Sequence, residues 1–458
     1  ASLSGLPIYY PCQPRKRQRM VDIVYFAIAV ATLAFALVSR RVTSSLLTAP
    51  LVFLAFGAML SVSGLFESDE HAHEALHLVA EITLVLVLFT DAAQVDLSRL
   101  RQDHSWPQRM LVVGLPVAIG LGTLIAPVLL PGWPIWEAAL LAAILAPTDA
   151  ALGQAVVTNP AVPERVRRAL TVESGLNDGL ALPAVILFAC MASATHSLGG
   201  TLDWVAFGLK QVVLGPLAGL LVGVPGAIAL KHAADKGWSD RALEGVAVVA
   251  LAALCYLLAD MIGGNGFIAA FVGGLCFGNL LQKRCSFAFE FAESEGQALI
   301  LVAFLMVGMI LLPEALSVSG WISIVIAIAS LFIVRPVAIW VAMIGSGAAP
   351  MTRLFLGWFG PRGLASALFA LLVLSKVATP HASEVLMIVI LTVALSALLH
   401  GITAVPGAQW YGRWVKRTNA PGEVQPMAAP AAKPLKDAGT KLLKPSLLTG
   451  TSGERGQE

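Results

Sequence analysis

The sequence predicts an all-α membrane protein that crosses the bilayer many times. The chain has 458 residues, of which 57% are hydrophobic and only 13% are charged, and its mean hydropathy is +0.80. A soluble domain carries about 25% charged residues, and a helix needs about 20 mainly apolar residues to cross the hydrocarbon core. Apolar runs of about that length recur along most of the chain. The net charge of +2 is too small to indicate a nucleic-acid partner.

About thirteen spans follow when the apolar runs are divided at polar, proline and glycine breaks. In chain order the predicted ranges are 21–38, 46–63, 75–95, 108–130, 135–157, 168–193, 203–229, 243–261, 265–281, 297–312, 318–344, 351–377 and 384–406. The eighth and ninth are separated at Gly263-Gly264-Asn265-Gly266.

The basic residues give the orientation. Lys and Arg occur in alternate connections, from Arg40 and Arg41 after the first span to Arg413, Lys416 and Arg417 after the last. Because cytoplasmic loops carry the excess of Lys and Arg, this pattern places the N-terminus outside the cell and the C-terminus in the cytoplasm. An odd number of spans agrees with it. We expect the protein to lie in the plasma (inner) membrane.

The two ends of the chain differ in composition from the spans. Residues 1–20 are polar and basic, and we expect them to form an extension outside the fold, either a leader or a segment foreign to the native chain. Residues 21–414 form the predicted transmembrane domain, with residues 415–458 as a disordered cytoplasmic tail rich in Pro, Ala, Lys and Ser.

Two of the spans are interrupted. The fifth contains Pro147-Thr148-Asp149, and the twelfth contains Gly357 to Gly363. Backbone groups freed by such breaks are tolerated only where protein buries them or a wet cavity receives them, so both breaks point inward. The interrupted spans lie seven apart, and an odd offset reverses their direction. This relation is typical of an inverted repeat and of a transporter binding site.

Three carboxylates lie within neighbouring spans: Asp149, Glu173 and Asp178. Each costs roughly 2.5–3.5 kcal/mol at the centre of a helix in the bilayer, so their presence indicates an ion or proton pathway. Glu173 and Asp178 are about 140° apart round a helix and need not share a ligand. The intramembrane arginines are Arg335 and Arg362, and we expect Glu173 to pair with Arg335 because an uncompensated buried charge is costly.

The polar residues around Asp178 suit a hard monovalent cation. Thr148, Ser174 and Asp178 supply oxygen atoms, and an unwound helix near Pro147 frees carbonyl groups. Asn177 adds a polar group without a second charge. Burial favours the protonated form of a carboxyl group, so the same group can hold either a proton or a cation. Competition between the two makes an exchanger, and no transition metal or cofactor is expected.

These residues resemble a known family, the monovalent cation:proton antiporters of the NhaP and sodium/proton exchanger type, over most of residues 21–414. The motifs that carry the resemblance are Thr148-Asp149, Glu173-Ser174, Asn177-Asp178-Gly179, the run from Asn265 to Leu275, Arg335-Pro336 and Gly360-Pro361-Arg362-Gly363. Each motif is weak alone, but the ordered set is specific.

The resemblance implies thirteen helices in two inverted six-helix repeats with crossed broken helices, a core that moves against a dimerisation domain, and a homodimer. It makes Asp178 the exchanging carboxylate and Thr148 and Ser174 cation ligands. It also makes Asp149, Asn177 and Arg362 supporting residues, and Glu173 with Arg335 a stabilising ion pair. Asn in place of a second Asp before Asp178 goes with electroneutral, one-for-one exchange of Na⁺ or Li⁺ for H⁺.

One position departs from the family. A glutamate commonly follows Leu-Phe in the third span, whereas Leu88-Phe89 is followed here by Thr90 and Asp91. Asp91 can replace it as a ligand one residue later, but a shift of about 100° round the helix can also turn it away.

Three alternatives to a Na⁺ or Li⁺ exchanger stay open. The first is a K⁺/H⁺ antiporter on the same fold, since the same oxygens bind both ions. The second is a channel or carrier for another cation, lined by Glu81, Glu244 and Asp260. The third is an intramembrane zinc protease, because His73, Glu74 and His77 match HExxH. A third zinc ligand is not evident, and a polar outer loop explains this His-rich stretch better. We therefore expect a transporter rather than an enzyme.

Overall fold

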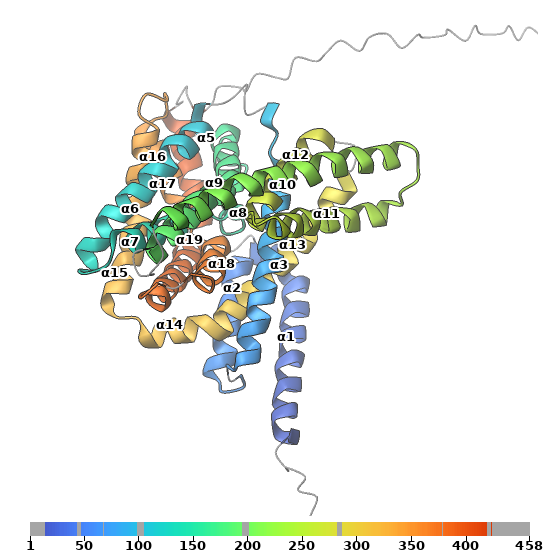
Figure 1. The fold of residues 1–458 in the computed structure, drawn as a ribbon. Helices are drawn as coiled ribbons and strands as arrows, with labels where there is room; N and C mark the ends of the chain where they lie inside the picture. Colours follow the sequence, from blue (N-terminus) through green and yellow to red (C-terminus); the bar gives the residue numbers. More distant parts are fainter. Residues whose placement is uncertain are drawn as a thin grey trace, which may run out of the picture. The chain divides into compact units, whose positions relative to one another are not determined.

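The structure is a computed structural model, and it describes residues 14–43, 47–66, 68–98, 105–194, 201–281, 286–377, 379–418 and 423. They belong to the first of two units of the chain, Ala1–Val424. Within these ranges the regular structure is helical and contains no strand (Figure 1). Most of the predicted extension at 1–20 and of the predicted tail at 415–458 lies outside the described residues.

The helices occupy the ranges that the apolar runs predict. In chain order they are α1 (Pro14–Thr43), α2 (Ala49–Val62), α3 (Glu70–Gln94), α5 (Ser105–Arg109), α6 (Leu115–Leu129), α7 (Ile135–Leu145), α8 (Ala150–Val157), α9 (Glu164–Ala194), α10 (Thr201–Asp235), α11 (Arg241–Met261), α12 (Gly266–Leu281), α13 (Ser286–Met306), α14 (Leu312–Val318), α15 (Trp321–Ala329), α16 (Arg335–Ala342), α17 (Pro350–Trp358), α18 (Leu364–Leu374) and α19 (Ala382–Thr418).

The predicted all-helical, multi-pass membrane fold is confirmed. Nine helices in the described part of the chain are long and apolar enough to cross a membrane, and α7 with α8, bent by 40° at their junction, makes a tenth. Three further apolar helices, α2, α12 and α18, are shorter. Several ends lie beyond the predicted ones: α13 starts at Ser286 rather than 297, and α19 runs to Thr418 rather than 406. Hydropathy marks the part of a helix in hydrocarbon, whereas the helix continues through the polar interface.

In the described residues, three short π-helical segments interrupt the long helices: η1 (Met110–Gly114), η2 (Val307–Leu311) and η3 (Ser330–Val334). Each one ends two residues before a proline: Pro116, Pro313 and Pro336. Proline lacks an N–H group, and its ring clashes with the carbonyl four residues earlier. A wider turn relieves this clash while the preceding N–H bonds five residues back. The chain thus stays helical through each proline, and η3 leads directly into Arg335.

The long helices pack closely where the residues between them have small side chains. α12 lies against α3 and α10, α7 against α6 and α9, and α18 against α19 (Figure 1). Where α12 meets α3, Gly274 faces the backbone of Phe89 and Gly278 faces the backbone of Ala93, with no room for a Cβ atom at either glycine. Without a hydrophobic force between helices in lipid, such small residues permit the backbone contact that holds them together.

We expect Gly278→Ala to lower the thermal unfolding midpoint of the detergent-solubilised protein. The added methyl group fits only if α12 moves away from Ala93, and overpacking of this kind costs about 1–3 kcal/mol. Gly120→Ala on α6 is the matched control, since a Cβ atom there meets nothing within 4 Å. An unchanged midpoint for Gly278→Ala would contradict the close approach of α12 to α3.

Candidate functional site

The first helix break lies between α7 and α8, at residues 146–149. Asp149 is the N-cap residue of α8, and its Oδ1 accepts hydrogen bonds from the backbone N–H of Ala151 at 2.7 Å and of Leu152 at 3.3 Å. A carboxylate at this position satisfies N–H groups that have no partner in the helix and complements the positive end of the helix dipole. The predicted interruption at Pro147 is therefore present, and Asp149 stabilises its second half.

The second break lies between α17 and α18, at residues 359–363, and it contacts the first. The backbone N–H of Asp149 donates to the carbonyl of Pro361 at 2.9 Å, and Asp149 Oδ2 accepts from the N–H of Leu364, also at 2.9 Å. A Cβ atom at Gly363 would overlap the Asp149 carboxylate. Glycine is thus needed at 363 because the two broken helices meet there.

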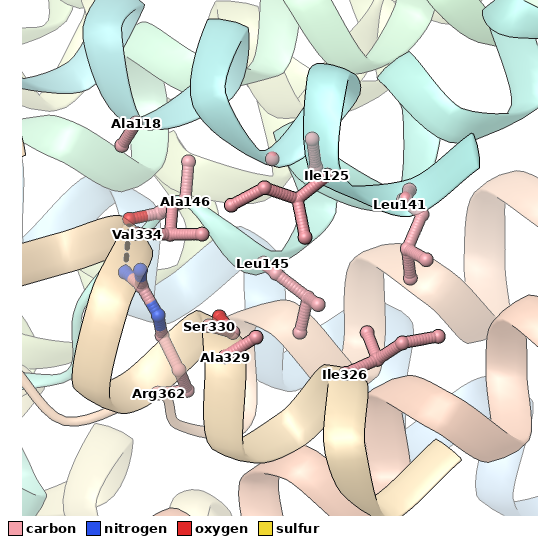
Figure 2. Close-up of a pocket in the computed structure, with 13 residues that line it drawn as sticks. Ala118, Ile125, Leu141, Leu145, Ala146, Ile326, Ala329, Ser330, Val334 and Arg362 are labelled. Carbon is pink, nitrogen blue, oxygen red and sulfur yellow. Dashed lines mark hydrogen bonds between the residues drawn. The ribbon is translucent and has the colours of Figure 1, made fainter. Parts of the chain in front are cut away.

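Arg362 connects the breaks from the other side. Its side chain is 1% exposed, and its Nη1 donates to the carbonyls of Ala146 at 2.5 Å and Pro147 at 3.1 Å. These are carbonyls that the end of α7 leaves without helical partners, and a cation is favourable at that end of a helix. Figure 2 shows Arg362 reaching Ala146 at the edge of a cavity with mainly apolar walls, where Ser330 is the other polar side chain.

A buried polar cluster adjoins the first break. Thr148 Oγ1 lies 3.1 Å from Ser174 Oγ and accepts a 2.5 Å hydrogen bond from Asn177 Nδ2. Asp178, on the next position of α9, is 7% exposed. Within the described part of the chain, Asp178 Oδ1 and Asn177 Oδ1 are buried and have no hydrogen-bond partner. Hydrogen bonds thus join Thr148, Ser174 and Asn177. Asp178 follows Asn177 on α9 and keeps an acceptor oxygen that could bind a cation or carry a proton.

The charges around Asp178 are negative. Asp91, Asp149 and Glu173 all interact electrostatically with its carboxylate. The positive charge of Arg335 is already bound by Glu173. A site of this kind is stable only when a proton or a cation compensates Asp178, because an isolated buried carboxylate is costly.

The predicted ion pair of Glu173 and Arg335 is present. Arg335 donates from Nη1 to Glu173 Oε1 at 2.8 Å and from Nη2 to Oε2 at 2.9 Å, in a bidentate geometry that joins α9 to α16. Both side chains are about 5% exposed or less. A Cβ atom at Gly360 would overlap the Arg335 guanidinium, so the second break also makes room for this pair.

The remaining candidates, Asp91 and the HExxH residues, belong to α3. Asp91 is half-buried on α3, where α9 approaches closely: a Cβ atom at Gly175 would lie 3.6 Å from its carbonyl oxygen. In the HExxH stretch, His73 Nδ1 contacts the carbonyl of Asp69 at 3.0 Å. No group of three His, Cys, Asp or Glu side chains suited to a metal ion occurs among the described residues.

Of the residues of the alternative cation path, Glu81 and Asp260 both lie near Tyr256, whereas Glu244 lies near the other end of α11. Tyr256 donates to Glu81, while Glu244 accepts from Ser239 at 3.0 Å near the start of α11. Asp260 is exposed at the other end of that helix.

Sequence reasoning missed the side of α19 that faces the second break. Ser396 Oγ accepts from the N–H of Arg362, and His400 contacts the carbonyl of Trp358. The signal was present, since Ser396, His400 and Thr403 are polar residues spaced four and three apart in an otherwise apolar run.

Glu173→Gln is expected to lower the thermal unfolding midpoint in detergent strongly. It leaves the Arg335 guanidinium buried without its counter-ion, a defect that costs about 3–5 kcal/mol. The double variant Glu173→Gln with Arg335→Gln has no buried charge left at this place, and its midpoint should lie above that of the single variant. A double variant less stable than Glu173→Gln would show that the ion pair is not what holds α9 to α16.

Several known proteins resemble this chain in sequence or in fold. The chain is 26% identical over 420 residues to the K⁺/H⁺ antiporter NhaP of Alkalimonas amylolytica, a match that covers 90% of this chain and 70% of that protein. It is 24% identical over 332 residues to the K⁺/H⁺ antiporter NhaP2 of Shewanella oneidensis, of whose length the chain spans only 55%. Among solved structures, that of the sodium proton antiporter MjNhaP1 from Methanocaldococcus jannaschii at pH 8 has a TM-score of 0.68 at 20% identity, covering 85% of this chain and 98% of that chain. At this identity the likeness shows the fold.

The family of this chain is identified by a match to a family model. The sequence model described as "Sodium/hydrogen exchanger, transmembrane" matches residues 27–410, which is most of the chain. The chain belongs to the sodium/hydrogen exchanger family.

Proposed function

We propose that this protein is a secondary transporter that exchanges Na⁺ or Li⁺ for H⁺, one for one. The observation that carries the proposal is the buried Asp178 carboxylate, whose Oδ1 has no partner among the described residues. Hydroxyl groups of Thr148 and Ser174 lie in the adjoining cluster, with the end of α7 next to Thr148. Carboxylate, hydroxyl and freed carbonyl oxygens are the ligands that a hard cation prefers. Asp91 is a further candidate ligand.

The exchange follows from the charge balance at Asp178. The carboxylate loses its proton on one side of the membrane, binds a cation, and is carried to the other side while closed off from water. It then releases the cation and takes up a proton. The occupied site has the same net charge in both forms, because the neighbouring Asn177 is neutral, and so the cycle is electroneutral. Thr148, Asn177 and Ser174 hold one another by hydrogen bonds, and Asp178 is the next residue of α9 after Asn177.

For the fold we propose thirteen spans in two inverted six-helix repeats. The breaks after α7 and α17 lie in the fifth and twelfth predicted spans, seven apart, and they contact each other. The fourth and eleventh spans, also seven apart, each contain a π-helical segment before a proline. In this arrangement a core that carries both breaks moves against a dimerisation domain of a homodimer in the plasma membrane, with the N-terminus outside and the C-terminus in the cytoplasm.

A K⁺/H⁺ antiporter is the second candidate. The relatives from Alkalimonas and Shewanella are named as K⁺/H⁺ antiporters, whereas MjNhaP1 is named as a sodium proton antiporter. The oxygens of Thr148, Ser174 and Asp178 serve either ion, so the choice depends on the size of the cavity that they enclose.

Asp178→Asn should abolish cation-dependent proton movement. The amide neither releases a proton nor compensates a cation, so the exchanging group is lost. The measurement uses purified protein in vesicles with an outward cation gradient, a clamped membrane voltage and a pH-sensitive dye inside. Asp203→Asn, at an exposed position of α10, is the matched control and should exchange as the wild type does. Exchange retained by Asp178→Asn would refute the assignment.

The same vesicle assay, repeated with different cations, identifies the transported ion. We expect Na⁺ and Li⁺ each to drive proton movement and K⁺ to fail, both as a substrate and as a competitor. Thr148→Val should raise the half-saturating Na⁺ concentration about five- to tenfold, because it removes one oxygen ligand and the hydrogen-bond partner of Asn177. Exchange driven by K⁺ but not by Na⁺ would replace the first candidate by the second.

A further inference from the structure

One face of α19 carries polar side chains toward the second helix break. Ser396, His400 and Thr403 are spaced four and three apart, which places them on one side of the helix. Ser396 is fully buried and His400 is 2% exposed. A buried polar group in a membrane protein needs a partner, and the partners of these groups lie at the break.

Ser396 and His400 bridge the break from end to end. Ser396 Oγ accepts from the backbone N–H of Arg362 at 2.7 Å and lies 3.1 Å from His400 Nδ1. On the other side of the ring, His400 Nε2 lies 2.8 Å from the carbonyl oxygen of Trp358, the last residue of α17. The imidazole also stacks on the Trp358 indole, with ring centroids 4.8 Å apart. α19 thus supplies partners for backbone groups on both sides of the gap.

Both ring nitrogens of His400 face a carbonyl oxygen. Nε2 lies 2.8 Å from that of Trp358, and Nδ1 lies 2.9 Å from that of Ser396. A carbonyl oxygen only accepts, so the neutral ring donates to one of the two. With its proton on Nε2 it bonds to the Trp358 carbonyl, and Nδ1 then accepts from the Ser396 hydroxyl.

The bridge leads directly to the cation site. The Arg362 backbone is held by Ser396, and the Arg362 side chain holds the carbonyls of Ala146 and Pro147, which immediately precede Thr148. We propose that His400, acting with Ser396, is a positioning residue: it fixes the second break against α19 and thereby sets where the first break presents Thr148 to the cation. This inference rests on the proposed exchange at Asp178.

The test compares four variants in the vesicle assay, with the thermal midpoint of each measured in parallel. His400→Leu removes both ring contacts and Ser396→Ala removes the partner of the Arg362 N–H. His400→Gln keeps an N–H donor for the Trp358 carbonyl. Thr392→Val is the matched control. Thr392 is fully buried one turn earlier on α19, and its hydroxyl donates to the carbonyl of Ile388 in the same helix at 2.7 Å.

We expect His400→Leu and Ser396→Ala to raise the half-saturating cation concentration about five- to tenfold, the effect of one lost buried hydrogen bond on an equilibrium. His400→Gln should stay within about twofold of the wild type, and Thr392→Val should leave the concentration unchanged.

A lower thermal midpoint for His400→Leu and Ser396→Ala with wild-type half-saturation would overturn the inference, since it would leave the bridge a structural role only. Ser396→Ala decides the matter if His400→Leu fails to fold. A wild-type protein without cation-dependent proton movement would instead refute the proposed function.

Discussion

The site depends on how two interrupted helices satisfy the backbone groups that they free within a membrane. Asp149 binds the N–H groups that begin α8 and the N–H of Leu364, Arg362 binds the carbonyls that end α7, and Ser396 binds the N–H of Arg362. Each break therefore supplies hydrogen-bonding partners for backbone groups that the other break leaves free. This mutual dependence explains why a proline, an aspartate, an arginine and several glycines must occur together at two places far apart in the sequence.

The same arrangement separates buried charges that are bound within the protein from one carboxylate that is free to bind a ligand. Arg335 is bound by Glu173, and the Arg362 guanidinium and the Asp149 carboxylate are taken up by backbone groups. Asp178 alone, among these buried charges, keeps an oxygen without a partner in the described structure. A bound ion pair can thus lie on the same helix as a carboxylate that stays available to a ligand. On the proposed exchange at Asp178, substitutions at Glu173 act mainly on stability, whereas those at Asp178 act on exchange.

Much of this was predictable from the sequence, because charges and breaks are rare in apolar spans. Pro147, the glycines at 357–363, and the pairing of Glu173 with Arg335 follow from their cost in lipid. The roles of Ser396 and His400 did not follow, since a polar side chain shows its purpose only when its partner is known, and that partner is the backbone at Trp358 and Arg362. The π-helical turns were also missed, although each precedes a proline. Helix ends beyond the hydrocarbon, as at α13 and α19, leave no hydropathy signal.

The central claim is that one carboxylate holds either a proton or a cation. It is tested most directly by titrating the purified, detergent-solubilised protein with Na⁺ in a weakly buffered solution, at a pH where the site is protonated, and counting the protons released. The account predicts one proton released for each Na⁺ bound, and neither binding nor release in Asp178→Asn. Na⁺ binding without proton release, or equal release in the variant, would contradict it.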